Sequence, residues 1–179
     1  MKYRKIFPYI IFAIFLIGFF VFSGNSHVNT VNKNVADQLV KENAKVIRMV
    51  DGDTIKVLIN NKEDTVRLIG IDTPETVDPR KPVQCFGVEA SNKTKEVLTG
   101  KTIILESDPT QGNRDKYQRL LRYVFLNDLN FNKFMISEGY AHEYTYRIPY
   151  KYQEKFKNAE RIAREENRGL WNENSCRNP

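Results

Sequence analysis

Two short alternating segments joined by a polar turn constrain the fold more than any other feature of the sequence. Residues 54–59 and 65–71 alternate between apolar and polar side chains, and the second segment becomes almost wholly apolar at its end. Such alternation predicts strands with a buried face, and the Asn-Asn-Lys-Glu-Asp segment at 60–64 predicts a hairpin turn between them. A further strand is expected at 44–50, before an Asp-Gly-Asp bend. The folded part therefore begins with a meander of three strands.

The rest of this part is expected to alternate helices with two more strands. The segment 87–98 has apolar residues at helical spacing and is followed by Gly100, which predicts a helix that ends there. Strands are expected at 102–105 and 120–126, and further helices at 130–138 and 149–168. Five short strands with a helix between the third and the fourth are typical of an OB-like barrel. The sequence thus predicts an α+β fold, mainly β: a five-stranded OB-like barrel with about three helices.

The N-terminal end differs sharply from the rest of the chain. Residues 6–22 are almost wholly apolar, and they follow three basic residues that supply half of the formal charge of +6. This pattern is typical of an export signal, with an uncleaved membrane anchor as the alternative. We expect a signal peptide or N-terminal anchor at 1–23, a linker at 24–43, the folded domain at 44–172 and a C-terminal tail at 173–179. The domain that remains is mildly basic, which suits an anionic partner.

Two cysteines, Cys85 and Cys176, lie in the part of the chain expected outside the cytoplasm. An even number of cysteines in an oxidising compartment predicts a disulfide, with two free thiols as the alternative. The sequence has no Cys-x-x-Cys motif. A zinc site built on thiolates is therefore not expected.

The end of the expected third strand carries the residues best suited to chemistry. Asp72, Thr73, Pro74 and Glu75 follow the apolar run, and Arg67 lies five residues before Asp72. One carboxylate can bind a hard cation, the arginine can bind a phosphodiester, and a second carboxylate can take a proton from water. Thr73 and Pro74 also resemble the start of a helix, in which case the segment would be structural. Further prolines shortly downstream disfavour that helix.

Two other segments could complete such a site. Asp51 and Asp53 point to the same side of an extended chain, so together with Asp72 they could surround an oxygen-ligated cation such as Ca²⁺. The alternative is a bend that merely favours Asp. The segment 115–119 follows a polar loop, and Arg119 at its end could bind a phosphate from a second side. An ordinary polar loop is the alternative there.

Tyr144 and Tyr146 precede the last expected helix and share one side of the chain if it is extended. They could form a platform for a nucleic-acid base, with aromatic packing against the barrel as the alternative. The histidines are isolated, since His27 lies in the expected linker and His142 stands alone. Neither a two-histidine phosphodiesterase site nor a Ser-His-Asp triad built on Ser137 is therefore expected.

The order of these motifs resembles that of a known family. The motifs are Asp-Gly-Asp-Thr (51–54), Arg-Leu-x-Gly-Ile-Asp-Thr-Pro-Glu (67–75), Asp-Lys-Tyr-x-Arg (115–119), Tyr-x-Tyr (144–146) and Gly-Leu-Trp (169–171). In this order they are similar to the motifs of the thermonucleases, the staphylococcal-nuclease-like family. The resemblance covers about residues 44–171. It implies an OB-fold and an exported, Ca²⁺-dependent endonuclease that hydrolyses DNA and RNA with low sequence specificity.

The resemblance also implies a role for each matching residue. The metal ligands would be Asp53, Asp72 and the carbonyl of Thr73; the catalytic residues Arg67, Glu75 and Arg119; and the substrate-binding residues Lys116, Tyr117, Tyr144 and Tyr146. In this scheme Glu75 is the general base and the two arginines bind the phosphate. One position departs from the family, which usually has Gly where this chain has Gln118. If the backbone there has a positive φ, Gln118 carries a conformational cost and could displace Arg119.

Two other functions stay open at the level of sequence. A non-catalytic OB module would bind single strands through the same aromatics, but it would have no reason to hold the acids and arginines together. A membrane-tethered nuclease would differ only in keeping residues 1–23. The implied partners are DNA and RNA, no stable protein partner is implied, and a monomer is expected. Its location would be extracellular or the outer face of the cell membrane.

Overall fold

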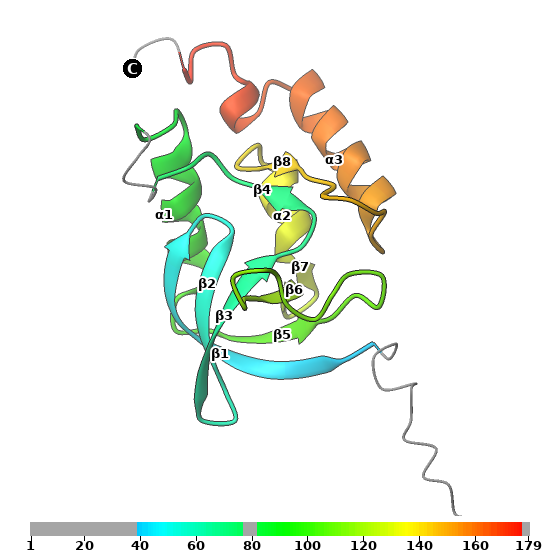
Figure 1. Cartoon of the computed structure of the whole chain (residues 1–179). Helices are drawn as coiled ribbons and strands as arrows, with labels where there is room; N and C mark the ends of the chain where they lie inside the picture. The colour runs from blue at the N-terminus through cyan, green and yellow to red at the C-terminus, as the bar shows by residue number, and fades with distance from the viewer. Residues whose placement is uncertain (1–38, 77–81, 177–179) are drawn as a thin grey trace, which may run out of the picture. The chain divides into compact units, whose positions relative to one another are not determined.

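The computed structural model of the chain describes residues 39–76 and 82–176 (Figure 1). The expected signal or anchor at 1–23, most of the expected linker and the end of the expected tail lie outside these residues. Within 39–76 and 82–176, no helix is both long and apolar enough to cross a bilayer.

A closed β-barrel forms the centre of the domain. Its strands are β1 (Lys41–Asp51), β2 (Thr54–Ile59), β3 (Lys62–Leu68), β5 (Thr102–Glu106) and β6 (Leu120–Leu126). They are hydrogen-bonded in the order β3-β2-β1-β5-β6, and a parallel pairing of β3 with β6 closes the barrel. A short strand β7 (Leu129–Asn130) continues from β6 as a hairpin. The five-stranded barrel confirms the expected fold class.

The alternating segments form the strands as their pattern predicts. Ile55 and Val57 on β2, and Val66 and Leu68 on β3, are at most 1% exposed and line the barrel interior. The turn between the two strands has positive φ at two consecutive asparagines, which is the geometry of the hairpin turns that match strand twist. β1 begins at Lys41, before the expected start at residue 44.

One expected strand, 65–71, is divided in two. β3 ends at Leu68, the chain turns at Gly70 with φ 77°, and β4 (Ile71–Asp72) pairs with β8 (His142–Glu143) in a separate sheet. The prediction of a single strand was wrong because of packing at Gly70, where a Cβ would lie 2.6 Å from the ring of Tyr150. The break places Asp72 on the small second sheet instead of the barrel wall.

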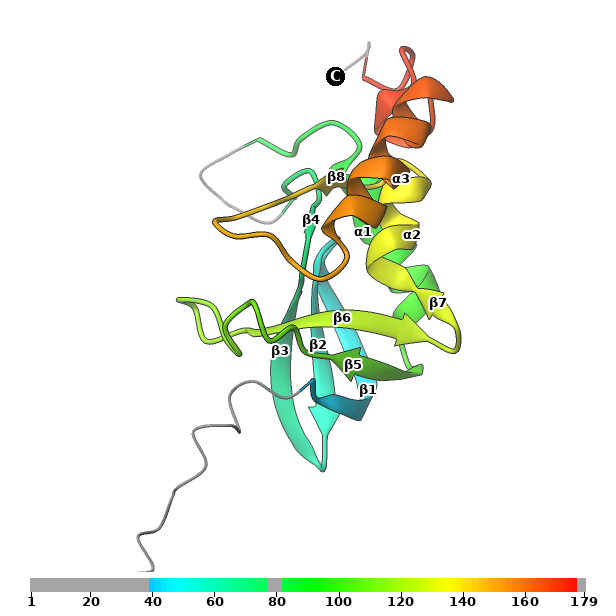
Figure 2. The ribbon, with the colours of Figure 1, turned by 90° about the vertical axis from the view of Figure 1, so that its right-hand side faces the viewer.

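Three helices gather at one end of the barrel (Figures 1 and 2). They are α1 (Gly87–Leu98), α2 (Phe131–Ser137) and α3 (Gln153–Glu165), followed by a 3-10 turn η1 (Gly169–Trp171). The last helix is shorter than expected at both ends. At its start, Tyr150 is buried and the N–H of Lys151 donates to Asp108, so residues 149–152 stay outside the helix. At its end, Asn167 has a φ of 53°, which a helix cannot continue through.

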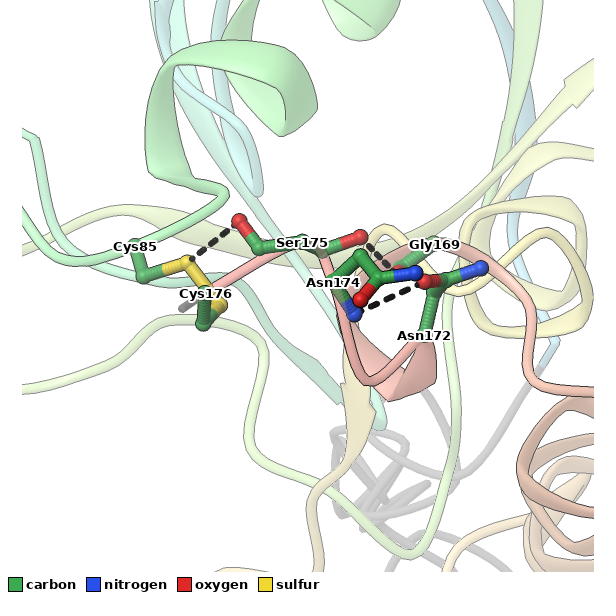
Figure 3. Close-up of a disulfide and its surroundings, with 6 residues drawn as sticks. All are labelled: Cys85, Gly169, Asn172, Asn174, Ser175 and Cys176. Atoms are coloured by element: carbon green, nitrogen blue, oxygen red, sulfur yellow. Dashed lines mark hydrogen bonds between the residues drawn. A yellow bond between two sulfur atoms is a disulfide. The ribbon is translucent and has the colours of Figure 1, made fainter. Parts of the chain in front are cut away.

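A disulfide joins Cys85 to Cys176, whose Cα atoms lie 5.6 Å apart (Figure 3). Cys85 lies just before α1 and Cys176 follows η1. The tail that leads to Cys176 is itself folded, because the Ser175 hydroxyl donates to the carbonyl of Gly169 at 2.8 Å. The bond therefore fastens the C-terminal end to the segment between Glu75 and α1.

Candidate active site

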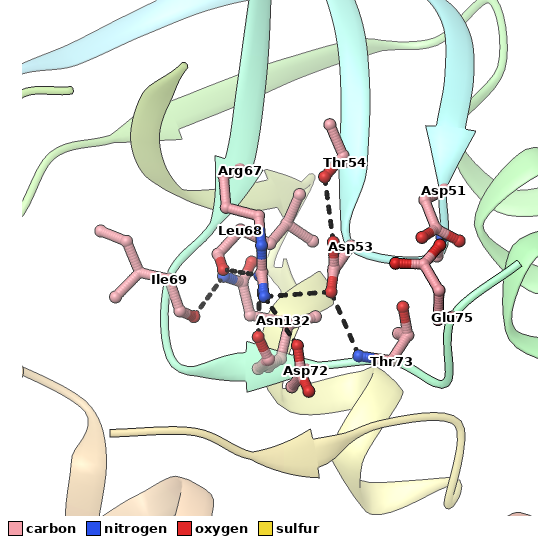
Figure 4. A network of polar contacts seen from close by, with 12 residues as sticks. Asp51, Asp53, Thr54, Arg67, Leu68, Ile69, Asp72, Thr73, Glu75 and Asn132 are labelled. Carbon is pink, nitrogen blue, oxygen red and sulfur yellow. Dashed lines mark hydrogen bonds and ion pairs between the residues drawn. The ribbon is translucent and has the colours of Figure 1, made fainter. Parts of the chain in front are cut away.

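Arg67 links two carboxylates at the mouth of the barrel (Figure 4). Its Nη2 lies 3.1 Å from an oxygen of Asp53 and 3.0 Å from an oxygen of Asp72. Its Nη1 donates at 2.8 Å to the carbonyls of Leu68 and Ile71, which flank the turn at the end of β3. These contacts hold the guanidinium in one orientation, with both acids beside it. The break at Gly70 is what brings Asp72 to this position.

The region around Asp53, Asp72 and Thr73 offers oxygen ligands of the kind that hard cations prefer. Asp53 accepts hydrogen bonds from the Thr54 hydroxyl at 2.9 Å and the Thr73 N–H at 3.1 Å. The Thr73 hydroxyl is buried and has no hydrogen-bond partner among the described residues. In the described part of the chain, no three His, Cys, Asp or Glu side chains converge on a metal-sized space. A cation held by Asp53 and Asp72 would thus need the Thr73 carbonyl and water as further ligands, a donor set that fits Ca²⁺.

Glu75 lies on the loop that follows Thr73 (Figure 4). Hydrogen bonds hold its backbone from two sides. Its N–H donates to the side-chain oxygen of Gln84 at 2.8 Å, and its carbonyl accepts from the Gln84 N–H at 2.9 Å. A Cβ on Gly87 would come within 2.9 Å of the carbonyl of Pro74, so only glycine lets α1 start this close to the loop. The segment leading into α1 therefore fixes the main chain of the proposed base.

Asp51 supports the same loop. Among the described contacts it does not join the group formed by Arg67, Asp53 and Asp72. One of its oxygens accepts from the hydroxyls of Thr76 and Ser91, at 2.8 and 3.1 Å, and from the N–H of Gly52. Burial raises the pKa of Asp51 above its ordinary value, although the hydrogen bonds from Thr76 and Gly52 act in the opposite direction. Asp51 thus ties the loop after Glu75 to β1 and to α1.

Arg119 is oriented by a carboxylate four residues before it. One oxygen of Asp115 accepts from the backbone N–H groups of Tyr117 and Arg119, each at 2.9 Å. The other lies 2.7 Å from both Nε and Nη2 of Arg119. Burial by itself would raise the pKa of Asp115, but the hydrogen bonds from Arg119 and Tyr117 lower it below its ordinary value, so the ion pair persists at neutral pH. The remaining Nη1 lies 3.4 Å from the Thr54 hydroxyl. Because that hydroxyl donates to Asp53, Thr54 connects Arg119 to Asp53.

A pocket of about 710 Å³ opens beside these groups. Of the residues proposed from sequence, its lining contains Arg67, Asp72, Lys116, Tyr117, Arg119, Tyr144 and Tyr146. Asp53, Thr73 and Glu75 are not part of the lining. Asp53 pairs with Arg67, and Thr73 and Glu75 lie on the loop that follows β4. The structure thus gathers the predicted phosphate-binding and aromatic residues around one space, together with one predicted metal ligand, Asp72. The other predicted ligands and the predicted base lie outside the lining.

Three of the four tyrosines that line the pocket are exposed, whereas Tyr150 is buried. Tyr117, Tyr144 and Tyr146 are 68%, 42% and 63% accessible, whereas Tyr140 is half-buried and stacks on Phe86. The ring centroids of Tyr144 and Tyr146 are 6.4 Å apart. The pair therefore forms an accessible aromatic surface and is not part of the hydrophobic core.

Several pocket residues were not predicted from the sequence. They include Thr110, Gln111, Arg114, Arg147, Ile148 and Tyr150. Gln84, which holds Glu75, was missed as well. No local motif marks these residues, because their contacts depend on how distant segments return to the barrel. The one available signal was positional: Arg114 directly precedes the Asp-Lys-Tyr-x-Arg motif.

The fold and the site together define a class, an OB barrel with a basic, aromatic pocket suited to a phosphate-containing ligand. Residues 65–173 match the family described as staphylococcal nuclease homologue. The chain is 45% identical over 127 residues to a thermonuclease of Staphylococcus hyicus, a match that covers 71% of this chain and 74% of that protein. It is 42% identical over 130 residues to a thermonuclease of Staphylococcus intermedius, covering 73% and 76% of the two chains. The protein belongs to the staphylococcal nuclease homologue family.

A third relative is the SPbeta prophage-derived endonuclease YokF of Bacillus subtilis. The identity is 42% over 128 residues, which is 71% of this chain but only 43% of that protein. This relative therefore has a large part with no counterpart in the match.

Proposed function

We propose that this protein is an exported, Ca²⁺-dependent endonuclease that hydrolyses phosphodiester bonds in DNA and RNA with low sequence specificity. The observation that carries the proposal is a pocket lined by both Arg67 and Arg119 beside exposed tyrosines. Asp72 also lines this pocket, Asp53 pairs with Arg67, and Glu75 lies on the loop that follows Thr73. Family membership and the similarity to two thermonucleases support the same activity.

In the proposed reaction Glu75 takes a proton from the attacking water. The new bond forms between the water oxygen and phosphorus, opposite the P–O bond that breaks. The displaced ester oxygen takes a proton from solvent and leaves as a hydroxyl group. Arg67 and Arg119 bind non-bridging oxygens and stabilise the negative charge that builds up there. Because Asp115 occupies the Nε–Nη2 edge of Arg119, that residue would bind phosphate through its remaining N–H groups.

A calcium ion would be held by Asp53, Asp72 and the carbonyl of Thr73. When bound, it supplies positive charge next to a phosphate oxygen, as hard cations do in phosphodiester hydrolysis. The buried hydroxyl of Thr73, which has no hydrogen-bond partner among residues 39–76 and 82–176, and the all-oxygen donor set support such an ion. Arg67 lies between the two carboxylates and would share them with the cation.

The rest of the pocket would bind the nucleic acid chain. The Nζ of Lys116 lies 4.9 Å from the ring centroid of Tyr117. In the proposal these two side chains would offer a charge and a hydroxyl to a neighbouring phosphate. Tyr144 and Tyr146 would contact the base side of the substrate. Stacking of this kind tolerates any base, which is consistent with low sequence specificity.

Export is supported by the disulfide and by the apolar segment at 6–22, since disulfides persist in oxidising compartments. A tethered enzyme would differ only in keeping residues 1–23. A non-catalytic module that binds single strands is the second candidate, supported by the exposed tyrosines alone.

A digestion assay tests the proposal. Plasmid DNA and a structured RNA are incubated with the protein in Ca²⁺, in Mg²⁺ or in EDTA. We expect cleavage of both substrates in Ca²⁺ and loss of cleavage in EDTA. Full activity in EDTA would contradict the metal requirement, and binding without cleavage in Ca²⁺ would favour the binding module.

A further inference from the structure

The residue before Arg119 has a backbone conformation that side chains disfavour. Gln118 has a φ of 65°, in the left-handed region where only glycine is free of steric cost. Gln118 lies between Tyr117 and Arg119, so relaxation of its backbone would turn the peptide that carries Arg119. Contacts from other parts of the chain must therefore stabilise the 115–119 loop in this conformation.

Arg114 contacts this strained residue directly. Its Nη1 donates to the carbonyl of Gln118 at 2.6 Å. The guanidinium is itself fixed by Asp64 on β3, with Nη1 2.9 Å and Nη2 2.6 Å from the two carboxylate oxygens. The hydrogen bond from Arg114 lowers the pKa of Asp64, with burial opposing it and the nearby Arg122 adding to it, so the pair is ionised at neutral pH.

Both ends of one peptide group are therefore held. The carbonyl of the Gln118–Arg119 peptide accepts from Arg114, and the N–H of the same peptide donates to Asp115 at 2.9 Å. Because a peptide group is planar, fixing its oxygen and its hydrogen fixes its plane and the Cα of Arg119. The main chain of Arg114 also forms an antiparallel β-bridge with Leu120, the residue that follows Arg119. The Asp64–Arg114 pair thus braces the loop from the β3 side of the barrel.

We propose that Asp64 and Arg114 are positioning residues that compensate for the left-handed Gln118 and set the orientation of Arg119 towards the substrate phosphate. The inference rests on the proposed function, in which Arg119 binds that phosphate. The alternative is that Arg114, which lines the pocket, binds substrate itself. The two roles predict opposite results for Asp64→Asn. If Arg114 is a positioning residue, loss of the Asp64 carboxylate releases it from its place and lowers kcat. If Arg114 binds the phosphate itself, the same loss leaves its guanidinium free to bind substrate.

The test measures kcat and KM on a single-stranded DNA oligonucleotide in Ca²⁺ for the full-length protein. Arg114→Met and Asp64→Asn should both lower kcat, the former on the order of 10-fold to 10²-fold, because small displacements of a catalytic group cost this much. Arg114→Lys should recover part of the loss, since it keeps a donor for the Gln118 carbonyl. The matched control is Arg161→Met, which removes an arginine paired with a carboxylate on α3 at 2.6 Å and should leave kcat unchanged.

The decisive variant adds Gln118→Gly to Arg114→Met. Glycine adopts the φ of residue 118 without cost, so the double variant should recover most of the lost kcat. No recovery, or an Asp64→Asn variant with lower KM and undiminished kcat, would overturn the positioning role and assign Arg114 to direct binding. If Arg114→Met does not fold by circular dichroism, Asp64→Asn alone and with Gln118→Gly gives the same comparison.

A reference variant separates this inference from the proposed function. Arg119→Met should abolish most of the turnover. If Arg119→Met retains normal kcat, the assigned role of Arg119 is wrong. If Arg119→Met is inactive while Arg114→Met and Asp64→Asn are normal, the positioning inference alone is overturned.

Discussion

Removing the Cys85–Cys176 disulfide should destabilise the protein strongly while leaving its chemistry intact. The two cysteines are 91 residues apart, so the bond closes a loop that spans most of the domain. In the chain-entropy treatment a loop of this length stabilises the folded state by about 4–5 kcal/mol, before any native-state strain. For a domain of this size each kcal/mol corresponds to roughly 2–4 °C in Tm, so a fall on the order of 10 °C is expected.

The assay compares the wild type with Cys85→Ser/Cys176→Ser by urea unfolding and by thermal melting. The wild type reduced by an excess dithiol serves as the matched control and should unfold like the double variant. Below the melting transition, turnover should be close to normal, because no proposed catalytic residue uses redox chemistry. A change in unfolding free energy under about 1 kcal/mol would refute the reasoning, as would two alkylatable thiols in the unreduced exported protein by mass spectrometry.

Substitutions at three other positions test separate parts of the account. Tyr144→Ala should weaken single-strand binding by roughly 1–3 kcal/mol in a fluorescence titration, because a stacking surface is lost; a drop in Tm with unchanged affinity would instead make Tyr144 structural. Gln84→Met should lower kcat more than Gln84→Glu, which keeps the acceptor for the Glu75 N–H; equal rates would mean that this hydrogen bond does not position the base. Glu106→Gln should destabilise the fold at pH 7, with the difference from wild type narrowing as pH falls below about 4 in urea titrations. A difference that is constant from pH 7 to pH 2 would contradict that prediction.

The sign of the Glu106 prediction follows from its surroundings. The carboxylate is 1% exposed, and burial alone would raise its pKa, but hydrogen bonds from Lys151, Tyr152 and Lys41 lower it below the ordinary value. A group with a lowered folded-state pKa contributes stability above its unfolded pKa and loses it as the pH falls through the folded one. The stabilising contribution is therefore present at neutral pH and lost in acid.

The barrel could be predicted from the sequence because its strands are specified locally. Alternation with period two at 54–59 and 65–68 fixes which side chains face the interior, and the paired asparagines fix the turn between them. The division of the third strand could not be seen in the same way. The turn at Gly70 depends on the ring of Tyr150, which arrives from a segment 80 residues later.

The candidate site, too, could be predicted only where local motifs mark its residues. The residues proposed from motif resemblance include those that the structure places around one pocket, such as Arg67, Arg119 and Tyr146. The residues that hold them were not predicted, because each acts across the fold: Gln84 reaches back nine positions and Asp64 contacts Arg114 50 positions away. A conformational cost at Gln118 was predicted for the case that its φ is positive, and its φ is 65°.

The central claim is that the loop carboxylate at position 75 activates water for phosphodiester hydrolysis. The most direct measurement is single-turnover cleavage of a single-stranded DNA oligonucleotide in Ca²⁺ by the wild type and by Glu75→Gln, with circular dichroism to verify folding and a titration to measure substrate affinity. The account predicts that Glu75→Gln binds the oligonucleotide normally and cleaves it at least about 10²-fold more slowly, the usual contribution of a general base. A folded Glu75→Gln variant that cleaves within a few-fold of the wild-type rate would contradict it.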